Sequence, residues 1–243
     1  MENEITAMAL DDIFRFECSS KISCFNECCR DLSQFLTPYD IVRLKNNIGL
    51  SSDVFIEKYT TQHMGPETGL PIVVIRQDPA NGFQCPFLSN EGCMVYQDRP
   101  GSCRTYPLAR LAYRSRETGQ INEQYVMLQE DHCKGRYQKK TQTVRQWIKE
   151  QGLDTYNQMN DLFMEIISLK NQFHPAPLDV KERHMFQLAC YDLDNFRKQV
   201  FNNNLAETMD VDPACLEAAE NDDVELMKLG FQWIKQAVFN EKQ

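Results

Sequence analysis

The stretch CSSKISCFNECC, residues 18–29, places four cysteines within twelve residues, and the last two are adjacent. Eight of the ten cysteines lie in the first 133 residues: Cys18, Cys24, Cys28, Cys29, Cys85, Cys93, Cys103 and Cys133. Only Cys190 and Cys215 lie beyond them. The chain therefore has a cysteine-rich part before about residue 140 and a cysteine-poor part after it. We predict a cysteine-rich metal-binding domain over residues 1–140 and a helical region over residues 141–243 that packs on it.

Composition excludes several classes of partner. The chain has 243 residues, a net charge of −9 and a pI near 5.0, which disfavours binding to a nucleic-acid backbone. No apolar run approaches the roughly 20 residues that span a bilayer. The acidic start, MENEITAMALDDIFRF, lacks the basic and apolar regions of a secretory signal. We therefore expect a cytoplasmic protein with no nucleic-acid or membrane partner, in a compartment that keeps thiols reduced.

Local patterns predict a mixed fold. LTPYDIVRLKNNIGLSSDVFIEKYT, residues 36–60, indicates two short helices, with Thr37 as N-cap and Gly49 as the stop of the first helix. PIVVIRQ at 71–77 is typical of a strand, and FQCPFL at 83–88 of its returning partner. ARLAYRSR and INEQYVMLQ, on either side of a turn at 117–120, indicate a second hairpin.

The rest of the chain is predicted to be helical. Thr143 and Gln146 match a capping box, and apolar residues repeat at helical spacing over 159–173, 185–200 and 224–238. We interpret these apolar faces, and with them Cys190 and Cys215, as the protein's own core; the alternative is a face that binds a partner protein. The predicted class is α+β and mostly helical: short helices and small β-hairpins in the cysteine-rich half, then a C-terminal helical bundle.

Clustered thiols in a reducing compartment favour metal binding. Thiolates suit zinc, copper(I) and iron–sulfur clusters, and eight of them match two four-ligand sites or one cluster with thiols to spare. The spacing lacks the C-x2-C knuckle of common zinc fingers. If residues 28 and 29 are extended, their side chains diverge and would serve two ions or bridge two. Buried unconnected cysteines, and disulfides in an exported protein, are the less favoured alternatives.

Ionised thiols need a counter-charge, because the chain is already acidic. Bound metal would supply most of it. Arg99 and Arg104 flank Cys103 in RPGSCRTYP and could donate to sulfur or balance its charge. His132 beside Cys133 could replace one thiol as a nitrogen ligand.

At these residues the chain resembles the YkgJ-like cysteine-cluster family, described as zinc- or iron-chelating. The resemblance rests on FECSSKISCFNECC, LTPYDIVRLK, CPFLSNEGCMVYQDRPGSCRTYP and DHCKG. It implies the eight cysteines of the first half as metal ligands, with Arg99, Arg104 and Tyr106 around them. The family's usual first cluster is C-x2-C-x2-C-C, whereas the gaps here are five and three. Cys24, Cys28 and Cys29 are therefore firmer ligand candidates than Cys18.

Three functions follow. The first is a metal-binding protein that holds an iron–sulfur cluster, which the irregular spacing slightly favours, or Zn²⁺. The second rests on similarity to flagellin lysine methylases and implies an S-adenosylmethionine-dependent protein lysine methyltransferase. For that reaction Tyr106, Tyr125 and Asp131 are candidates by residue type, although no glycine-rich nucleotide motif is present. The third is an interaction module whose C-terminal helices bind a protein partner.

Overall fold

We describe the fold from a computed structural model, which describes residues 6–30, 33–115 and 117–239. It forms two compact units, each built from two separate stretches of chain. Unit 1 comprises Met1–Gln34 and Arg76–Gln158, and unit 2 comprises Phe35–Ile75 and Met159–Gln243. All eight cysteines of the first half lie in unit 1. The sequence predicts two domains that meet at residue 140. The division into compact units does not test that boundary, which stays a prediction.

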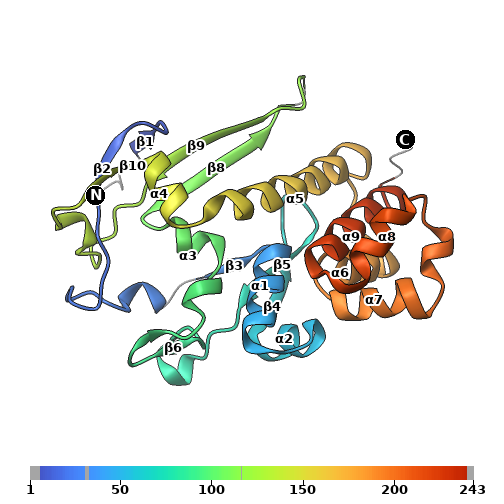
Figure 1. Cartoon of the computed structure of the whole chain (residues 1–243), viewed down its shortest axis with the longest axis horizontal. Helices are drawn as coiled ribbons and strands as arrows, with labels where there is room; N and C mark the ends of the chain where they lie inside the picture. Colours follow the sequence, from blue (N-terminus) through green and yellow to red (C-terminus); the bar gives the residue numbers. More distant parts are fainter. Residues whose placement is uncertain (1–5, 31–32, 116, 240–243) are drawn as a thin grey trace. The chain divides into compact units, whose positions relative to one another are not determined.

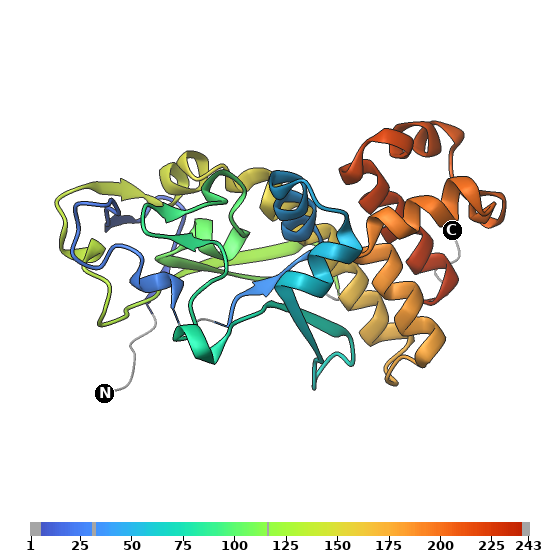
Figure 2. The same ribbon diagram turned by 90° about the horizontal axis from the view of Figure 1, so that it is seen from below.

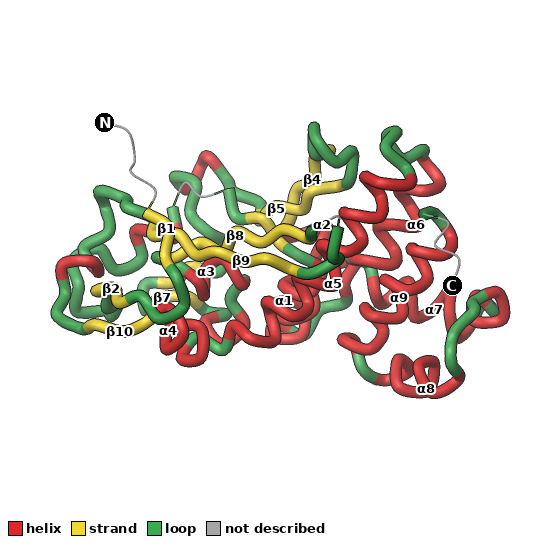
Figure 3. Tube along the Cα trace, turned by 90° about the horizontal axis from the view of Figure 1, so that it is seen from above, coloured by secondary structure: helices red, strands yellow, loops and turns green. Residues whose placement is uncertain are grey.

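Antiparallel strands form the frame of unit 1 (Figures 1 and 3). A three-stranded sheet has the order β1-β9-β8, and two pairs, β2 with β10 and β6 with β7, complete the strands of this unit in the described residues. Their bounds are β1 Thr6–Met8, β2 Ile13–Arg15, β6 Leu88–Ser89, β7 Gly92–Cys93, β8 Leu108–Arg114, β9 Ile121–Met127 and β10 Thr141–Thr143.

Short helical turns connect these strands. Most are one turn long, so they can hold a side chain in place without forming a core of their own. Their bounds are η1 Glu27–Cys29, η2 Pro79–Asn81, η3 Tyr96–Asp98, α3 Gly101–Thr105, η4 Gly135–Tyr137 and α4 Val144–Glu150, followed by the first residues of α5, Leu153–Phe173.

An aromatic cluster forms the centre of unit 1. Trp147 meets Phe14 and Phe16 edge to face, at centroid distances of 6.1 and 5.6 Å. Phe16 in turn contacts Tyr106 at 6.1 Å. The indole N–H of Trp147 donates to the carbonyl of Thr105 at 2.9 Å. Edge-to-face pairs of this kind stabilise by about 0.5–1.5 kcal/mol beyond their burial. The cluster therefore fixes the end of α3 and the strand that leads to Cys18.

Unit 2 combines a small sheet with helices (Figure 2). The sheet has the order β3-β5-β4 and is antiparallel throughout. The elements of this unit are β3 Phe35–Leu36, α1 Pro38–Ile48, α2 Ser52–Tyr59, β4 Thr60–Met64, β5 Pro71–Ile75, the remainder of α5, α6 Val180–Cys190, α7 Leu193–Asn202, η5 Leu205–Thr208, α8 Pro213–Asn221 and α9 Asp223–Ala237.

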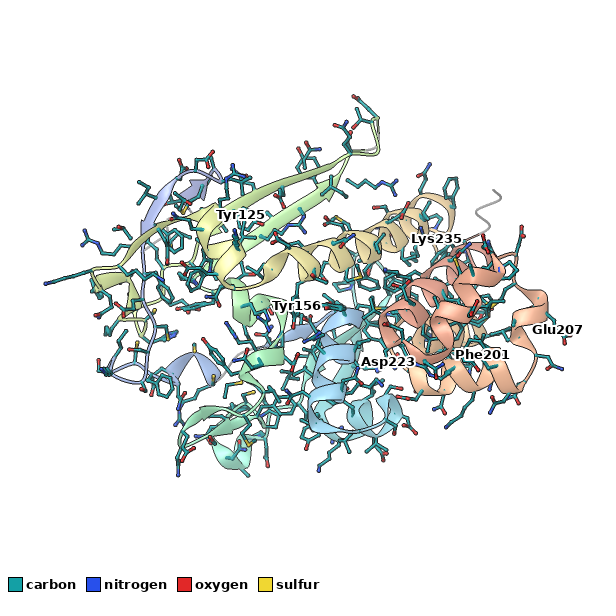
Figure 4. All side chains as sticks on the ribbon, viewed as in Figure 1. Tyr125, Tyr156, Phe201, Glu207, Asp223 and Lys235 are labelled. Carbon is teal, nitrogen blue, oxygen red and sulfur yellow. The ribbon has the colours of Figure 1, made fainter. Side chains whose placement is uncertain are left out.

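Two features hold the helices of unit 2 together. Gly230 of α9 lies so close to α6 that a Cβ atom would be 2.2 Å from the carbonyl oxygen of Ala189. Buried Lys45 of α1 pairs with Asp223 at 2.8 Å and with Asp194 at 3.2 Å. Figure 4 labels Asp223 at the start of α9. Close backbone contact and a buried ion network thus join α1, α6, α7 and α9.

The structure confirms the predicted class: it is α+β and mostly helical. The two helices after residue 36, their Thr37 and Gly49 caps, the hairpin of β8 and β9 and the Thr143 capping box are confirmed. Within the described residues, no helix combines the length and the apolar composition that crossing a bilayer requires.

Two predictions about elements are wrong. The segment 83–88 does not return along β5, which instead pairs with β3 and β4. Thr60–Met64, a polar segment, takes the place beside β5 because it follows α2 directly and reverses over a short turn. Cys215 was expected in the core but is exposed, because it lies in the first turn of α8 and Ala219, one turn later, is the buried residue. Cys190 is fully buried, as predicted.

Candidate metal centre

Hydrogen bonds draw the Cys18 segment and the Cys133 loop together. The amide of Glu17 donates to the carbonyl of Gly135 at 3.2 Å. A Cβ atom on Gly135 would be 2.8 Å from the carbonyl oxygen of Glu17 and 2.5 Å from the Phe16 ring, so only glycine allows this approach. The amide of Lys134 donates to the sulfur of Cys24 at 3.1 Å. Backbone N–H donors to sulfur are what a metal-bound thiolate also requires.

The adjacent thiols of Cys28 and Cys29 lie in the 3-10 turn η1. Their sulfur atoms are 4.0 Å apart. The segment is therefore not extended at these residues, and the divergence expected of an extended pair does not apply. With Zn–S bonds of about 2.3 Å, two sulfurs of a regular tetrahedron lie about 3.8 Å apart. The pair can bind one metal atom.

Cys85 and Cys93 are tied to the same turn. The amide of Cys85 donates to the carbonyl of Cys29 at 2.9 Å. Cys93 ends the two-residue strand β7 and pairs with Leu88. Gly92, with a φ of 120°, carries no side chain where the ring of Phe25 approaches to 3.1 Å from the Cβ position. Both cysteines therefore belong to loops that contact the Cys18–Cys29 segment.

Cys103 is exposed in the middle of α3, and its thiol lies 3.3 Å from the side-chain oxygen of Gln34. Arg99 lies close enough to Cys93 to lower the pKa of that thiol, although burial raises it more. Arg99 also stacks on the Tyr96 ring at 3.9 Å. The Arg99 guanidinium is thus near the Cys93 sulfur, and its role as a counter-charge in a metal site stays a prediction.

Arg104 has a different set of contacts. Its guanidinium donates to the backbone carbonyls of Arg99, at 3.2 Å, of Gln151, at 2.8 Å, and of Gln97. It also lies over the Tyr156 ring at 4.8 Å. These bonds fasten α3, the helix that carries Cys103, to the surrounding backbone, so the contacts of Arg104 are with the backbone. A direct role toward sulfur stays a prediction.

The Tyr106 hydroxyl lies beside Cys133 and Glu130. Burial first, and then these two neighbours, raise its pKa far above the ordinary range. The hydroxyl is fully buried, yet among the described residues it meets no partner at hydrogen-bonding geometry. An unmade hydrogen bond of this kind costs about 1–3 kcal/mol. A thiolate or carboxylate that moves slightly toward it would remove that cost.

The other residues predicted by type lie in different surroundings. Tyr125 is buried in β9 and accepts a hydrogen bond from Asn157 at 3.2 Å. Asp131 is fully exposed and pairs loosely with Arg136 at 3.9 Å. The methyltransferase hypothesis, which these residues would serve, stays a prediction.

The thiols of unit 1 influence one another electrostatically. Burial, followed by the neighbouring Cys28, Cys24 and Cys133, raises the pKa of Cys18 to about 11. Burial also raises the pKa of Cys85 to about 11. A backbone hydrogen bond opposes this shift, and the neighbouring Cys93 and Cys28 reinforce it. The hydrogen bond to Cys29, then burial, raises the pKa of Cys28. These shifts place Cys28 near both Cys18 and Cys85, and for these three thiols they favour the protonated form where no cation is bound.

The sulfurs are neighbours rather than a closed cage. Among the described residues, no three His, Cys, Asp or Glu side chains converge closely enough to hold a metal ion. Like charges repel, so such convergence requires the cation itself. The donor set nevertheless fits zinc or iron, because Cys28 and Cys29 stand at the spacing for one metal atom and the hydroxyl of Tyr106 lacks a partner.

Glu130 is a neighbour of the site that the sequence analysis missed. It contributes to the raised pKa of Cys28 and of Tyr106, although it is not the main cause in either case. His132, the predicted alternative ligand, directs its Nε2 to the Glu130 carboxylate at 3.4 Å and is 39% exposed. The sequence signal was present, since Glu130 precedes Cys133 by one turn in QEDHC.

Comparison with known families decides the classification. A family model named CxxCxxCC, described as "Putative zinc- or iron-chelating domain", matches residues 17–161, more than half of the chain. This chain belongs to the CxxCxxCC family. The match agrees with the resemblance that the cysteine pattern predicts and includes all eight cysteines of unit 1. The family description makes chelation of zinc or iron the function class of the domain. Searches of curated proteins and of solved structures gave no significant match.

Proposed function

We propose that this CxxCxxCC protein binds zinc or iron through the cysteines of unit 1, with Cys28 and Cys29 on the same metal atom. The 4.0 Å distance between their sulfurs carries the proposal. The Lys134 amide on Cys24, and the Cys85 amide on the carbonyl of Cys29, support it by holding further thiols near the pair. Metal binding would deprotonate the thiols and supply the positive charge that this acidic chain lacks.

The spacing of the pair narrows the kind of centre. Two thiolates on one metal atom suit tetrahedral zinc, a single iron or a [2Fe–2S] cluster. A [4Fe–4S] cluster held by four cysteines takes one cysteine on each iron, which does not suit sulfurs at this separation. The irregular cysteine spacing favours iron–sulfur, and the pair distance then favours the two-iron form. Zinc is the alternative.

Anaerobic purification followed by elemental analysis tests the proposal. We expect stoichiometric zinc, or iron with acid-labile sulfide. A two-iron cluster gives a brown protein with broad absorbance near about 400 nm, and zinc a colourless one. Purified protein with no stoichiometric zinc, iron or sulfide, which also fails to take up zinc or ferrous iron, would contradict the proposal. Because thiolate ligands need a reducing compartment, we place the protein in the cytoplasm, with the metal as its partner.

The Cys215→Ser variant is the matched control for every cysteine substitution. Cys215 is an exposed free thiol in unit 2, outside the residues that the family model covers. It should retain the full metal content. A loss of metal in Cys215→Ser equal to that in a unit 1 variant would show that the measurement reports non-specific thiol binding.

A further inference from the structure

Cys28 and Cys29 are also close enough to react with each other. Their sulfur atoms are 4.0 Å apart, and across this distance a thiolate on one sulfur accepts a hydrogen bond from the other thiol. Both residues lie in the turn η1 and are half-buried, so each remains partly accessible to solvent. When an oxidant converts a thiol to a sulfenic acid, a thiol beside it condenses with it to a disulfide. Each member of the pair has such a neighbour in the other.

The contacts of two other thiols of unit 1 are of a different kind. The sulfur of Cys24 accepts a hydrogen bond from the amide of Lys134 at 3.1 Å. The thiol of Cys103 lies 3.3 Å from the side-chain oxygen of Gln34. The contact within the pair, in contrast, joins sulfur to sulfur. The geometry therefore favours a bond within the pair over a bridge from either of these cysteines.

A disulfide within the pair would be strained. Adjacent Cα atoms are about 3.8 Å apart across a trans peptide, whereas disulfides usually join Cα atoms about 4.4–6.8 Å apart. Strained disulfides are easily reduced, and they are the labile or regulatory ones. A bond between these two sulfurs would therefore suit reversible control better than it would suit holding the fold together.

We propose that Cys28 and Cys29 form a reversible redox site: in the metal-free chain, hydrogen peroxide oxidises the pair to a disulfide, and a dithiol reduces it again. One sulfur, as its thiolate, attacks a peroxide oxygen and breaks the O–O bond, which gives a sulfenic acid and, after uptake of a proton, water. The second sulfur then attacks the sulfenic sulfur, the S–S bond forms, and its proton leaves with the hydroxide as a second water. The two thiols together lose two electrons and two protons, and one peroxide becomes two waters.

Bound metal and the disulfide would exclude each other, a consequence that rests on the proposed function. A tetrahedral metal holds two sulfurs about 3.8 Å apart, close to their present separation, whereas a disulfide holds them at about 2.05 Å. At a zinc concentration 100 times the dissociation constant, about one chain in 100 is metal-free. Zinc at that concentration should therefore slow oxidation of the pair about 100-fold.

The test treats the full-length chain, reduced and metal-free, with hydrogen peroxide and then blocks the remaining thiols with N-ethylmaleimide. Trypsin releases residues 22–30, ISCFNECCR, for tandem mass spectrometry. We expect this peptide to lack two hydrogens at Cys28 and Cys29 and to carry one maleimide on Cys24, and dithiothreitol should restore both thiols. Cys215→Ser, which lacks only an exposed thiol of unit 2, should give the same product.

The outcomes separate the two proposals. Oxidised wild type should bind zinc at least about 100-fold more weakly than the reduced protein, because two thiolate ligands are lost. If the reduced wild type takes up neither zinc nor iron, the proposed function fails and the disulfide result stands by itself. If peroxide yields only sulfinic acids, or bridges from Cys28 or Cys29 to other cysteines, the redox site is overturned and the proposed function stands. Equal oxidation rates with and without zinc would overturn the control by metal.

Discussion

At the scale of single residues, Cys28 and Cys29 show how local backbone decides what a thiol can do. In an extended segment adjacent side chains point to opposite faces, which is why the pair was expected to serve two different ions or to bridge two. The 3-10 turn η1 instead leaves their sulfurs 4.0 Å apart. The sulfurs of these two residues therefore lie at a distance that suits one metal atom, as we propose.

Substituting either member of the pair should abolish tight metal binding. We expect Cys28→Ser and Cys29→Ser each to lower metal affinity at least about 100-fold, which is close to 3 kcal/mol, because a hydroxyl is a much poorer ligand than a thiolate for zinc and iron. Titration against a competing chelator measures the loss. Wild-type affinity in both single variants, with Cys215→Ser as reference, would show that the pair is not bound to the metal.

The thiol of Cys85 predicts how stability depends on pH. Burial raises its pKa to about 11 from an ordinary 9.0, so the metal-free fold favours the protonated thiol. Its contribution to stability is complete below pH 9 and is lost as the pH rises through 11. We expect urea unfolding of the metal-free protein to show falling stability over this window, and a smaller fall in Cys85→Ala. Parallel pH profiles for the two proteins would contradict this.

At the scale of elements, close contacts between backbones place the helices and loops. Gly135 allows the Cys133 loop to touch the Cys18 segment, and Gly230 allows α9 to touch α6. Neither residue has a positive φ, so the reason for glycine in both cases is space rather than backbone conformation. The sequence shows that both residues are glycines, but it does not show why. Only the packing reveals which atoms a side chain at these positions would contact.

Gly230→Ala should strongly destabilise unit 2. The added Cβ would lie 2.2 Å from the carbonyl oxygen of Ala189, and backbone cannot move aside as a side chain can. We expect a loss of about 1–3 kcal/mol in the free energy of unfolding, the usual cost of overpacking. Chemical denaturation measures it. Lys228→Ala, on the same helix, removes only an exposed ion pair and should cost less than about 1 kcal/mol; equal losses in the two variants would refute the packing argument.

The ion network around Lys45 should also be sensitive. Lys45 is almost fully buried between Asp223 and Asp194, and Arg197 also pairs with Asp223. Lys45→Met removes the positive charge that lies between the carboxylates of Asp223 and Asp194. We expect the free energy of unfolding to fall by about 3 kcal/mol, the lower end for breaking a buried ion pair. Thermal and urea unfolding report the change. Lys140→Met, which removes a half-exposed pair with Glu150, is the control. Equal stability in both variants would show that the network contributes nothing measurable.

At the scale of the whole molecule, the chain alternates between two units. The chain begins in unit 1 and passes into unit 2 at Phe35. It returns to unit 1 at Arg76 and enters unit 2 again at Met159. The thiols are confined to one unit apart from Cys190 and Cys215. A metal held by these thiols would act directly on unit 1.

Removing the metal should loosen unit 1 more than unit 2. Metal at 100 times its dissociation constant stabilises the folded form by about 2.7 kcal/mol. We expect hydrogen exchange, measured on peptides with and without chelator, to rise mainly over residues 17–30 and 84–138 and little in α6 and α9. A uniform rise over all helices would show that the units unfold together, and no rise anywhere would show that bound metal does not stabilise the fold.

Much of the secondary structure could be predicted from local patterns. Thr37 and Gly49 bound α1, Thr143 and Gln146 cap α4, and the apolar spacing over 224–238 predicts α9. Such features depend on neighbours within a few residues of the chain. The partner of β5 was predicted wrongly because strand pairing joins residues distant in sequence. Glu130 was missed for the same reason, since its neighbours Tyr106 and Cys28 come from other segments.

The amino-acid sequence by itself determined the chemistry of this protein: the number and grouping of thiols, the acidic charge that calls for a cation, and the family to which the cysteine pattern belongs. Only the tertiary structure decided which thiols are neighbours, and that the sulfurs of Cys28 and Cys29 lie 4.0 Å apart, at a distance that suits one metal atom. The physical reason is that ligand type is a property of each side chain, whereas coordination depends on distances of a few ångströms between loops that only packing brings together.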